Sequence, residues 1–162
     1  MVHILLNPEY TNSKSIGWLL LFAERIWVVE MVCNGLTEVM VEEVEEAVLS
    51  FKGKSMQIPP MYSALKVNGK KLYELAREGK EIERKPRPIE IFEIKIMEME
   101  LPKLTVEVTC SKGTYIRSLA RDIGKKLGVG GCVLELKRTR VRDFLIKDSI
   151  TLEELEKRKA EN

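Results

Sequence analysis

Two segments of the chain interleave tyrosine with lysine and arginine at close spacing. One runs from residue 57 to 79, and the other runs from residue 110 to 124 and contains Gly113-Thr114-Tyr115-Ile116-Arg117. Aromatic rings stack on nucleobases and cations bind phosphates, so this combination is typical of RNA-binding surfaces. The two segments are therefore the first candidates for a functional site.

Other familiar catalytic patterns are absent from the sequence. It contains no glycine-rich phosphate loop, no Cys/His cluster and no Gly-x-Ser-x-Gly motif. The single histidine, His3, cannot form a metal site by itself. A nucleophile would have to be a carboxylate, a thiol or a hydroxyl, and we expect no metal or other cofactor, although a carboxylate-only metal site stays open.

The net charge of +2 conceals a strong segregation of charge along the chain. Residues 51–88 carry ten basic and four acidic side chains, for +6, and residues 109–142 carry nine and two, for +7. Acidic stretches precede, separate and follow these two basic blocks. If the blocks meet on one face, they form a phosphate-binding surface; the alternative is an ordinary solvated surface.

The remaining composition indicates a cytoplasmic globular protein. Cys33, Cys110 and Cys132 are widely spaced and form no Cys-x-x-Cys motif, which predicts reduced cysteines in the core. No stretch approaches the roughly 20 apolar residues that span a bilayer, so no membrane partner is expected.

Hydrophobic periodicity predicts the elements that must position the two segments. We expect helices over 41–51, 72–78, 113–127 and 152–159, and strands over 25–33, 63–67, 88–99, 104–110 and 132–141. The dipeptide Asn68-Gly69 is the one preferred in two-residue hairpins. This order predicts an α+β fold, with helices packed on a mixed, largely antiparallel sheet.

The two segments closely resemble the TruB/dyskerin family of RNA pseudouridine synthases, and the resemblance covers roughly residues 25–145. It implies part of the family's catalytic-domain fold, no cofactor, and a uridine that is flipped out of its RNA. The implied substrate is a uridine of the tRNA T-loop, so the expected partner is RNA, and the tRNA T-arm in particular. Three parts of the chain are expected: an unassigned segment 1–24, a synthase-like domain 25–150 and a charged terminal helix 151–162.

The resemblance also implies roles for individual residues. Arg117 matches the arginine that pairs with the family's catalytic aspartate, and Tyr115 matches a tyrosine that orders the uracil pocket. Leu136 matches an apolar residue near the base, and Trp27 is the nearest match to a tyrosine that stacks on the uracil. Ordinary core packing is the alternative for Tyr115 and Leu136, and it is the role that we favour for Trp27.

Seven cations are candidates for RNA contacts, although each is also compatible with a solvated surface charge. They are Lys66, Lys70, Lys71, Arg77, Lys137, Arg138 and Arg140.

The family's catalytic aspartate lies in a Gly-Thr-Leu-Asp-Pro stretch upstream of the strand at Trp27, and residues 1–24 contain no aspartate. A C-terminal RNA-binding domain is not found either. Two hypotheses follow: a synthase that needs another segment or a second chain for its aspartate, or a non-catalytic RNA-binding module. Because an unpaired buried arginine is costly, Arg117 should be solvated or paired with another group.

The resemblance makes one geometric prediction. Tyr115 and Arg117 should lie at the start of the helix that directly follows the strand 104–110. Leu136, on the next strand, should lie on the same side of the sheet and within reach of Tyr115. The cleft beside Arg117 should be open, shallow and basic.

Overall fold

A computed structural model describes residues 3–4, 25–34 and 41–160. Its centre is a six-stranded antiparallel sheet in the order β3-β6-β7-β2-β8-β9. The strands are β2 (Arg25–Asn34), β3 (Gly53–Gln57), β6 (Arg87–Glu100), β7 (Lys103–Cys110), β8 (Gly130–Val141) and β9 (Phe144–Leu145). The expected α+β fold on a largely antiparallel sheet is confirmed.

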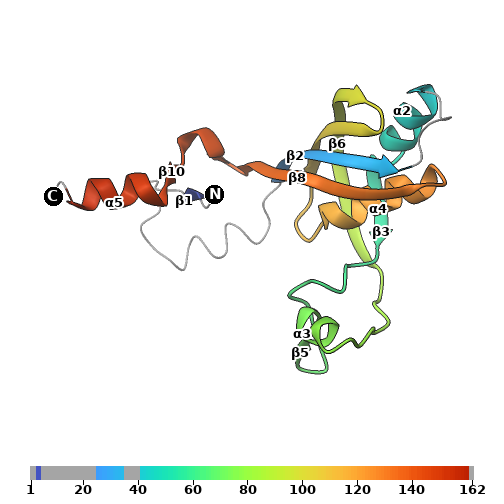
Figure 1. Cartoon of the computed structure of the whole chain (residues 1–162), viewed down its shortest axis with the longest axis horizontal. Helices are drawn as coiled ribbons and strands as arrows, with labels where there is room; N and C mark the ends of the chain where they lie inside the picture. The colour runs from blue at the N-terminus through green and yellow to red at the C-terminus, as the bar shows by residue number, and fades with distance from the viewer. Residues whose placement is uncertain (1–2, 5–24, 35–40, 161–162) are drawn as a thin grey trace.

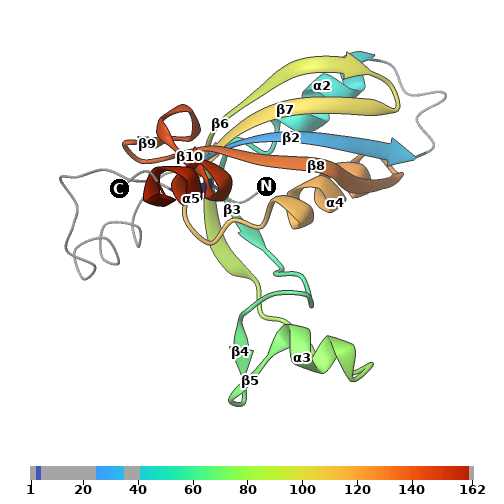
Figure 2. The ribbon, with the colours of Figure 1, turned by 60° about the vertical axis from the view of Figure 1, so that its left-hand side comes forward.

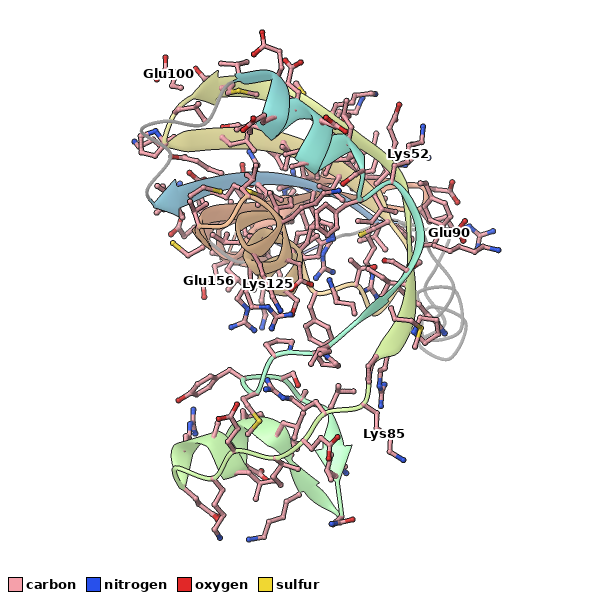
Figure 3. All side chains as sticks on the ribbon, turned by 90° about the vertical axis from the view of Figure 1, so that its right-hand side faces the viewer. Lys52, Lys85, Glu90, Glu100, Lys125 and Glu156 are labelled. Carbon is pink, nitrogen blue, oxygen red and sulfur yellow. The ribbon has the colours of Figure 1, made fainter. Side chains whose placement is uncertain are left out.

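One face of this sheet carries the core. Residues directly opposite in antiparallel strands point to the same face, so the pairs of Val29 with Val106 and with Leu136 place these three side chains together. The helices α2 (Val41–Leu49) and α4 (Ile116–Lys126) lie within the curve of the sheet on this side (Figure 3). The other face carries exposed ion pairs, such as Lys95 with Glu107.

Helix α4 forms because its apolar residues recur at helical spacing. Ile116, Leu119, Ala120 and Ile123 are buried in the core cluster. The helix also approaches β8 very closely: a Cβ atom added at Gly124 would lie 2.5 Å from the backbone nitrogen of Gly131. Two glycines at this contact therefore allow the backbone of α4 to lie directly on the sheet.

Residues 58–86 form a small lobe that projects from the sheet (Figure 2). It consists of the hairpin β4 (Lys66–Val67) and β5 (Lys70–Lys71) followed by α3 (Leu72–Arg77). Asn68 and Gly69 both have positive φ, as the expected hairpin turn requires. The strand predicted over 63–67 is only two residues long, because Tyr62–Leu65 instead follow the surface of α3 through backbone hydrogen bonds from Leu72 and Tyr73.

The C-terminal part lies beside the sheet. A 3₁₀ turn (Ile146–Asp148) leads into β10 (Ile150–Thr151), which pairs with β1 (His3–Ile4), and α5 (Leu152–Ala160) follows (Figure 1). Apart from His3 and Ile4, the unassigned segment 1–24 lies outside the described residues. Within the described ranges, no helix has both the length and the hydropathy that crossing a membrane requires.

The structure corrects three sequence expectations. β3 was not predicted, because its residues show no alternation and most are exposed at the edge of the sheet. Helix α2 ends at Leu49 and buries Ala47, whereas Val41 is exposed. Cys33 and Cys110 are buried free thiols as expected, but Cys132 is exposed, because its pairing with Val32 turns it away from the core.

Candidate active site

The loop between β7 and α4 delivers Tyr115 and Arg117 to the edge of the core. Its first residue, Ser111, donates its backbone N–H to the Glu90 carbonyl at 2.8 Å, and its hydroxyl accepts the Glu90 N–H at 2.9 Å. Gly113 turns the chain with a φ of 80°, a conformation that favours glycine. Tyr115 is the N-cap of α4 and Arg117 lies in its first turn, so the predicted placement of both residues is confirmed.

Gln57 fixes the start of α4, and sequence reasoning assigned it no role. Its side chain is 4% exposed, although glutamine is usually a surface residue. The Tyr115 backbone N–H donates to Gln57 Oε1 at 2.8 Å, and Gln57 Nε2 donates to the Tyr115 carbonyl at 3.1 Å. One amide side chain at the end of β3 thereby holds both backbone groups of Tyr115, which fixes the position of this residue.

The segment after Gln57 is hydrogen-bonded to the first turns of α4. Ser118 Oγ donates to the Ile58 carbonyl at 3.0 Å, and an Arg117 guanidinium nitrogen donates to the Tyr62 carbonyl at 2.8 Å. Arg117 is exposed, and its partner is a carbonyl rather than a carboxylate. Arg117 was expected to be either solvated or paired with another group. In the described part of the chain it is both exposed to solvent and bonded to a substitute partner.

Leu136 lies on the side of the sheet that α4 covers. Its pairing with Val29, which is fully buried, places the two side chains on one face, and Leu136 is 40% exposed at the open part of that face. The expected common side of the sheet for Tyr115 and Leu136 is therefore consistent with the register. Direct contact between these two side chains stays a prediction.

Trp27 lies on the same face and packs against the core cluster, in line with the packing role favoured from the sequence. The guanidinium of Arg138, the residue opposite Trp27 on β8, lies 4.4 Å from the centre of its ring. Partial burial lowers the pKa of Arg138, and repulsion from Arg25 lowers it further. The described residues thus place two arginines and a tryptophan together, and Arg25 is a second residue that sequence reasoning missed.

The seven cations proposed to contact RNA fall into two groups. Lys66, Lys70, Lys71 and Arg77 lie in the projecting lobe, where Lys71 and Arg77 flank the Tyr73 ring at 5.3 and 5.4 Å. A hydrogen bond to the Tyr73 hydroxyl raises the pKa of Lys71. The other three lie on β8 and do not share a face: Lys137 and Arg140 pair with Val28 and Ile26, whereas Arg138 pairs with Trp27.

The two basic blocks of the sequence meet where the lobe joins α4. Arg117, from the second block, bonds to Tyr62 of the first, and Lys125 lies on the side of α4 that faces the lobe (Figure 3). Among the described residues near the start of α4, none forms a nucleophile–base pair, and Asp122 is bound to Arg121 at 2.8 Å. The geometry provides donors and an aromatic N-cap residue, which suits binding and orientation of a substrate.

Comparison with known proteins identifies relatives of this arrangement. A family model described as TruB family pseudouridylate synthase (N terminal domain) matches residues 27–116. A second, described as tRNA pseudouridylate synthase B C-terminal domain, matches residues 117–162. A C-terminal domain model of the family therefore does match, through the terminal helix, whereas the sequence motifs had indicated no resemblance past about residue 145.

Curated relatives and solved structures agree with the two family models. The tRNA pseudouridine synthase B of Clostridium kluyveri is 57% identical over 115 residues, which are 71% of this chain and 40% of that protein. The enzyme of the same name from Francisella philomiragia is 52% identical over 120 residues, 74% of this chain and 40% of that protein.

Among solved structures, a Cbf5-Nop10-Gar1 complex matches with a TM-score of 0.63 and 31% identity, over 78% of this chain and 33% of that one. An H/ACA RNP bound to a substrate RNA containing 2'-deoxyuridine matches with a TM-score of 0.61 and 26% identity, over 81% and 32%. The chain spans about 40% of the length of the curated relatives it matches. It belongs to the TruB family of pseudouridylate synthases.

Proposed function

We propose that this chain provides the carboxy-terminal half of the catalytic domain of a TruB-type tRNA pseudouridine synthase. The substrate is a uridine of the tRNA T-loop, and the reaction needs no cofactor. The observation that carries this proposal is the Gln57-bound N-terminus of α4, which has Tyr115 at its N-cap and Arg117 in its first turn. Residues 25–150 form the synthase-like part, and α5 is a terminal helix.

The chemistry assigns different tasks to these residues. During isomerisation the uracil leaves C1′ of the ribose, rotates and reattaches through C5, so the pocket must hold a free base without releasing it. Tyr115 and Leu136 bound that pocket, and Arg117 is available to hold a carboxylate ionised beside the sugar. This task requires Arg117 to exchange its contact with the Tyr62 carbonyl for the carboxylate.

The carboxylate itself comes from another segment or a second chain. The sequence has three aspartates, and none stands in the Gly-Thr-Leu-Asp-Pro context that the family uses. Asp122 and Asp143 each pair with the neighbouring arginine, Arg121 and Arg142. Neither is therefore available at the start of α4.

RNA is the partner, and the lobe and β8 supply the cations that bind its phosphates. The lobe carries four of the seven candidates, and two of them, Lys71 and Arg77, flank Tyr73, which gives both charge and an aromatic face. A solved relative of this fold is bound to a substrate RNA, which supports the same partner class. We assign the protein to the cytoplasm, where its three free thiols would stay reduced and tRNA is modified.

A two-chain assay tests this function. Tritium release from a T-arm stem-loop labelled at C5 of uridine is measured with this chain alone, and then with a separate polypeptide carrying the upstream half of a curated relative. We expect no release from either chain alone and measurable release from the mixture, because the carboxylate is the group that acts at the sugar. Multiple turnovers by this chain alone would contradict the proposal that its carboxylate comes from elsewhere. A mixture that binds RNA but releases no tritium would favour a non-catalytic RNA-binding module.

A further inference from the structure

A cluster of hydrogen-bond donors lies on the core face of the sheet, apart from Tyr115 and Arg117. Arg25 and Trp27 alternate along β2 and so share this face, and Arg138 lies opposite Trp27 on β8. The pairing of Arg25 with Cys110 on β7 confirms which face it occupies, because Cys110 is fully buried. Two guanidiniums and an indole therefore meet at one end of the core.

The described residues give this cluster no matching acceptor. Arg25 Nε and Trp27 Nε1 are both buried and have no hydrogen-bond partner. The strand residues that share this face near the cluster are Val141, Leu136, Val108 and Cys110, and none carries a charge. The acidic residues on these strands occupy register positions whose side chains point to the opposite face of the sheet; they are Glu30, Glu107 and Glu135.

Such an arrangement is unfavourable without a ligand. Buried donors normally find partners, and two like charges repel each other where water is partly excluded. The lowered pKa of Arg138 reflects the same two causes, burial and the charge of Arg25. Arg138 nevertheless stays open to solvent, so a ligand can reach it.

We infer that Arg25 and Arg138 form a phosphate-binding site beside Trp27, and that its ligand is a phosphodiester of the bound RNA. A phosphate offers several acceptor oxygens to the guanidinium groups, and its negative charge offsets the repulsion between them. An RNA phosphodiester is a better match than an acidic peptide, because the other cations of β8 and those of the lobe are already proposed to bind RNA phosphates. This inference rests on the proposed function; it adds Arg25 to the candidate cations and joins it with Arg138 in one site.

Two arginines of β8 provide a matched pair of variants. Arg138→Gln removes a positive charge from the core face of the sheet. Arg140→Gln, two residues further along β8, removes a positive charge from the opposite face. Because Arg138 carries a partly buried and repelled charge, Arg138→Gln should unfold at the same temperature as the wild type or at a higher one. A structural arginine would behave in the opposite way, with a lower unfolding temperature.

The first arm of the test uses inorganic phosphate against chloride at equal ionic strength. Phosphate should raise the unfolding temperature of the wild type and of Arg140→Gln, since a ligand that binds only the folded state stabilises it. It should not raise that of Arg138→Gln. Equal shifts in the two variants would overturn the site.

The second arm measures the affinity of a fluorescent T-arm stem-loop. Arg138→Gln should weaken binding by about tenfold or more and reduce the salt dependence by about one phosphate contact. Arg140→Gln should weaken it by about twofold, as a surface cation does. Equal losses in the two variants would overturn this inference alone, whereas a wild-type chain that binds no stem-loop would overturn both the RNA ligand and the RNA-binding part of the proposed function.

Discussion

Side chains at the start of α4 and side chains in the projecting lobe are held in place by different kinds of contact. The start of α4 is fixed by long-range contacts: Gln57 lies 58 positions from Tyr115, and Ser118 bonds to Ile58. The hairpin and α3 of the lobe are held by local contacts, such as the Leu72 N–H to the Leu65 carbonyl at 2.8 Å. Six residues of α4 are buried, whereas only two residues of α3 are buried. The start of α4 is therefore rigidly placed, and α3 is held mainly by the adjoining hairpin.

This difference matches the tasks that we propose for the two regions. A reaction that rotates a free base needs pocket residues held to within a fraction of an ångström. Phosphate contacts tolerate more movement, because they act at longer range and add up over several cations. The cations of the lobe, such as Lys71 and Arg77 beside Tyr73, are therefore well placed on a lobe that depends on few buried side chains.

Gln57→Leu should produce the largest loss in the rigid region. The substitution leaves the backbone N–H and carbonyl of Tyr115 without partners in a buried setting, and we expect a loss of about 2–4 kcal/mol in the free energy of unfolding. Denaturant titration measures it. The control is Met56→Ala on the same strand, whose side chain is 62% exposed and should cost less than about 0.5 kcal/mol. Similar losses in both variants would show that Gln57 does not hold α4.

Gly131→Ala tests the contact between α4 and β8. The added methyl group would clash with the backbone of Ala120, so the helix must shift away from the sheet, and the expected loss is about 1–3 kcal/mol. Gly130→Ala is the matched control, because nothing lies within 4 Å of its added methyl group. If the neighbouring glycines tolerate alanine equally, the close approach of helix and sheet is not what fixes the pocket.

The lobe should respond in binding rather than in stability. Arg77→Gln is expected to leave the unfolding free energy nearly unchanged and to weaken stem-loop binding by about twofold, with a shallower dependence of log K on log salt. Lys95→Gln removes an exposed cation from the far face of the sheet, where it pairs with Glu93 and Glu107, and should leave binding unchanged. A wild-type affinity that is flat between low and moderate salt would refute the proposed surface altogether.

The sequence predicted the parts of this molecule that depend on local pattern. The apolar stripe of Ile116, Leu119 and Ile123 predicted α4, and Asn68-Gly69 predicted the lobe hairpin, because both follow from backbone geometry and neighbouring residues. Gln57 and Arg25 could not be assigned, because their roles arise from strand register across distant segments. A glutamine two residues before Pro59-Pro60 gives no indication that its amide will bind a helix start 58 positions away.

The most direct test of the central claim is the activity of Arg117→Gln in the two-chain tritium-release assay. Arg121→Gln, one helical turn further along α4, is the control, because Arg121 is already paired with Asp122. If Arg117 holds the catalytic carboxylate, Arg117→Gln should lower kcat/KM by about a hundredfold or more, while Arg121→Gln should change it by less than about threefold. Equal activities of the two variants would contradict the assignment of the start of α4 as the reaction site.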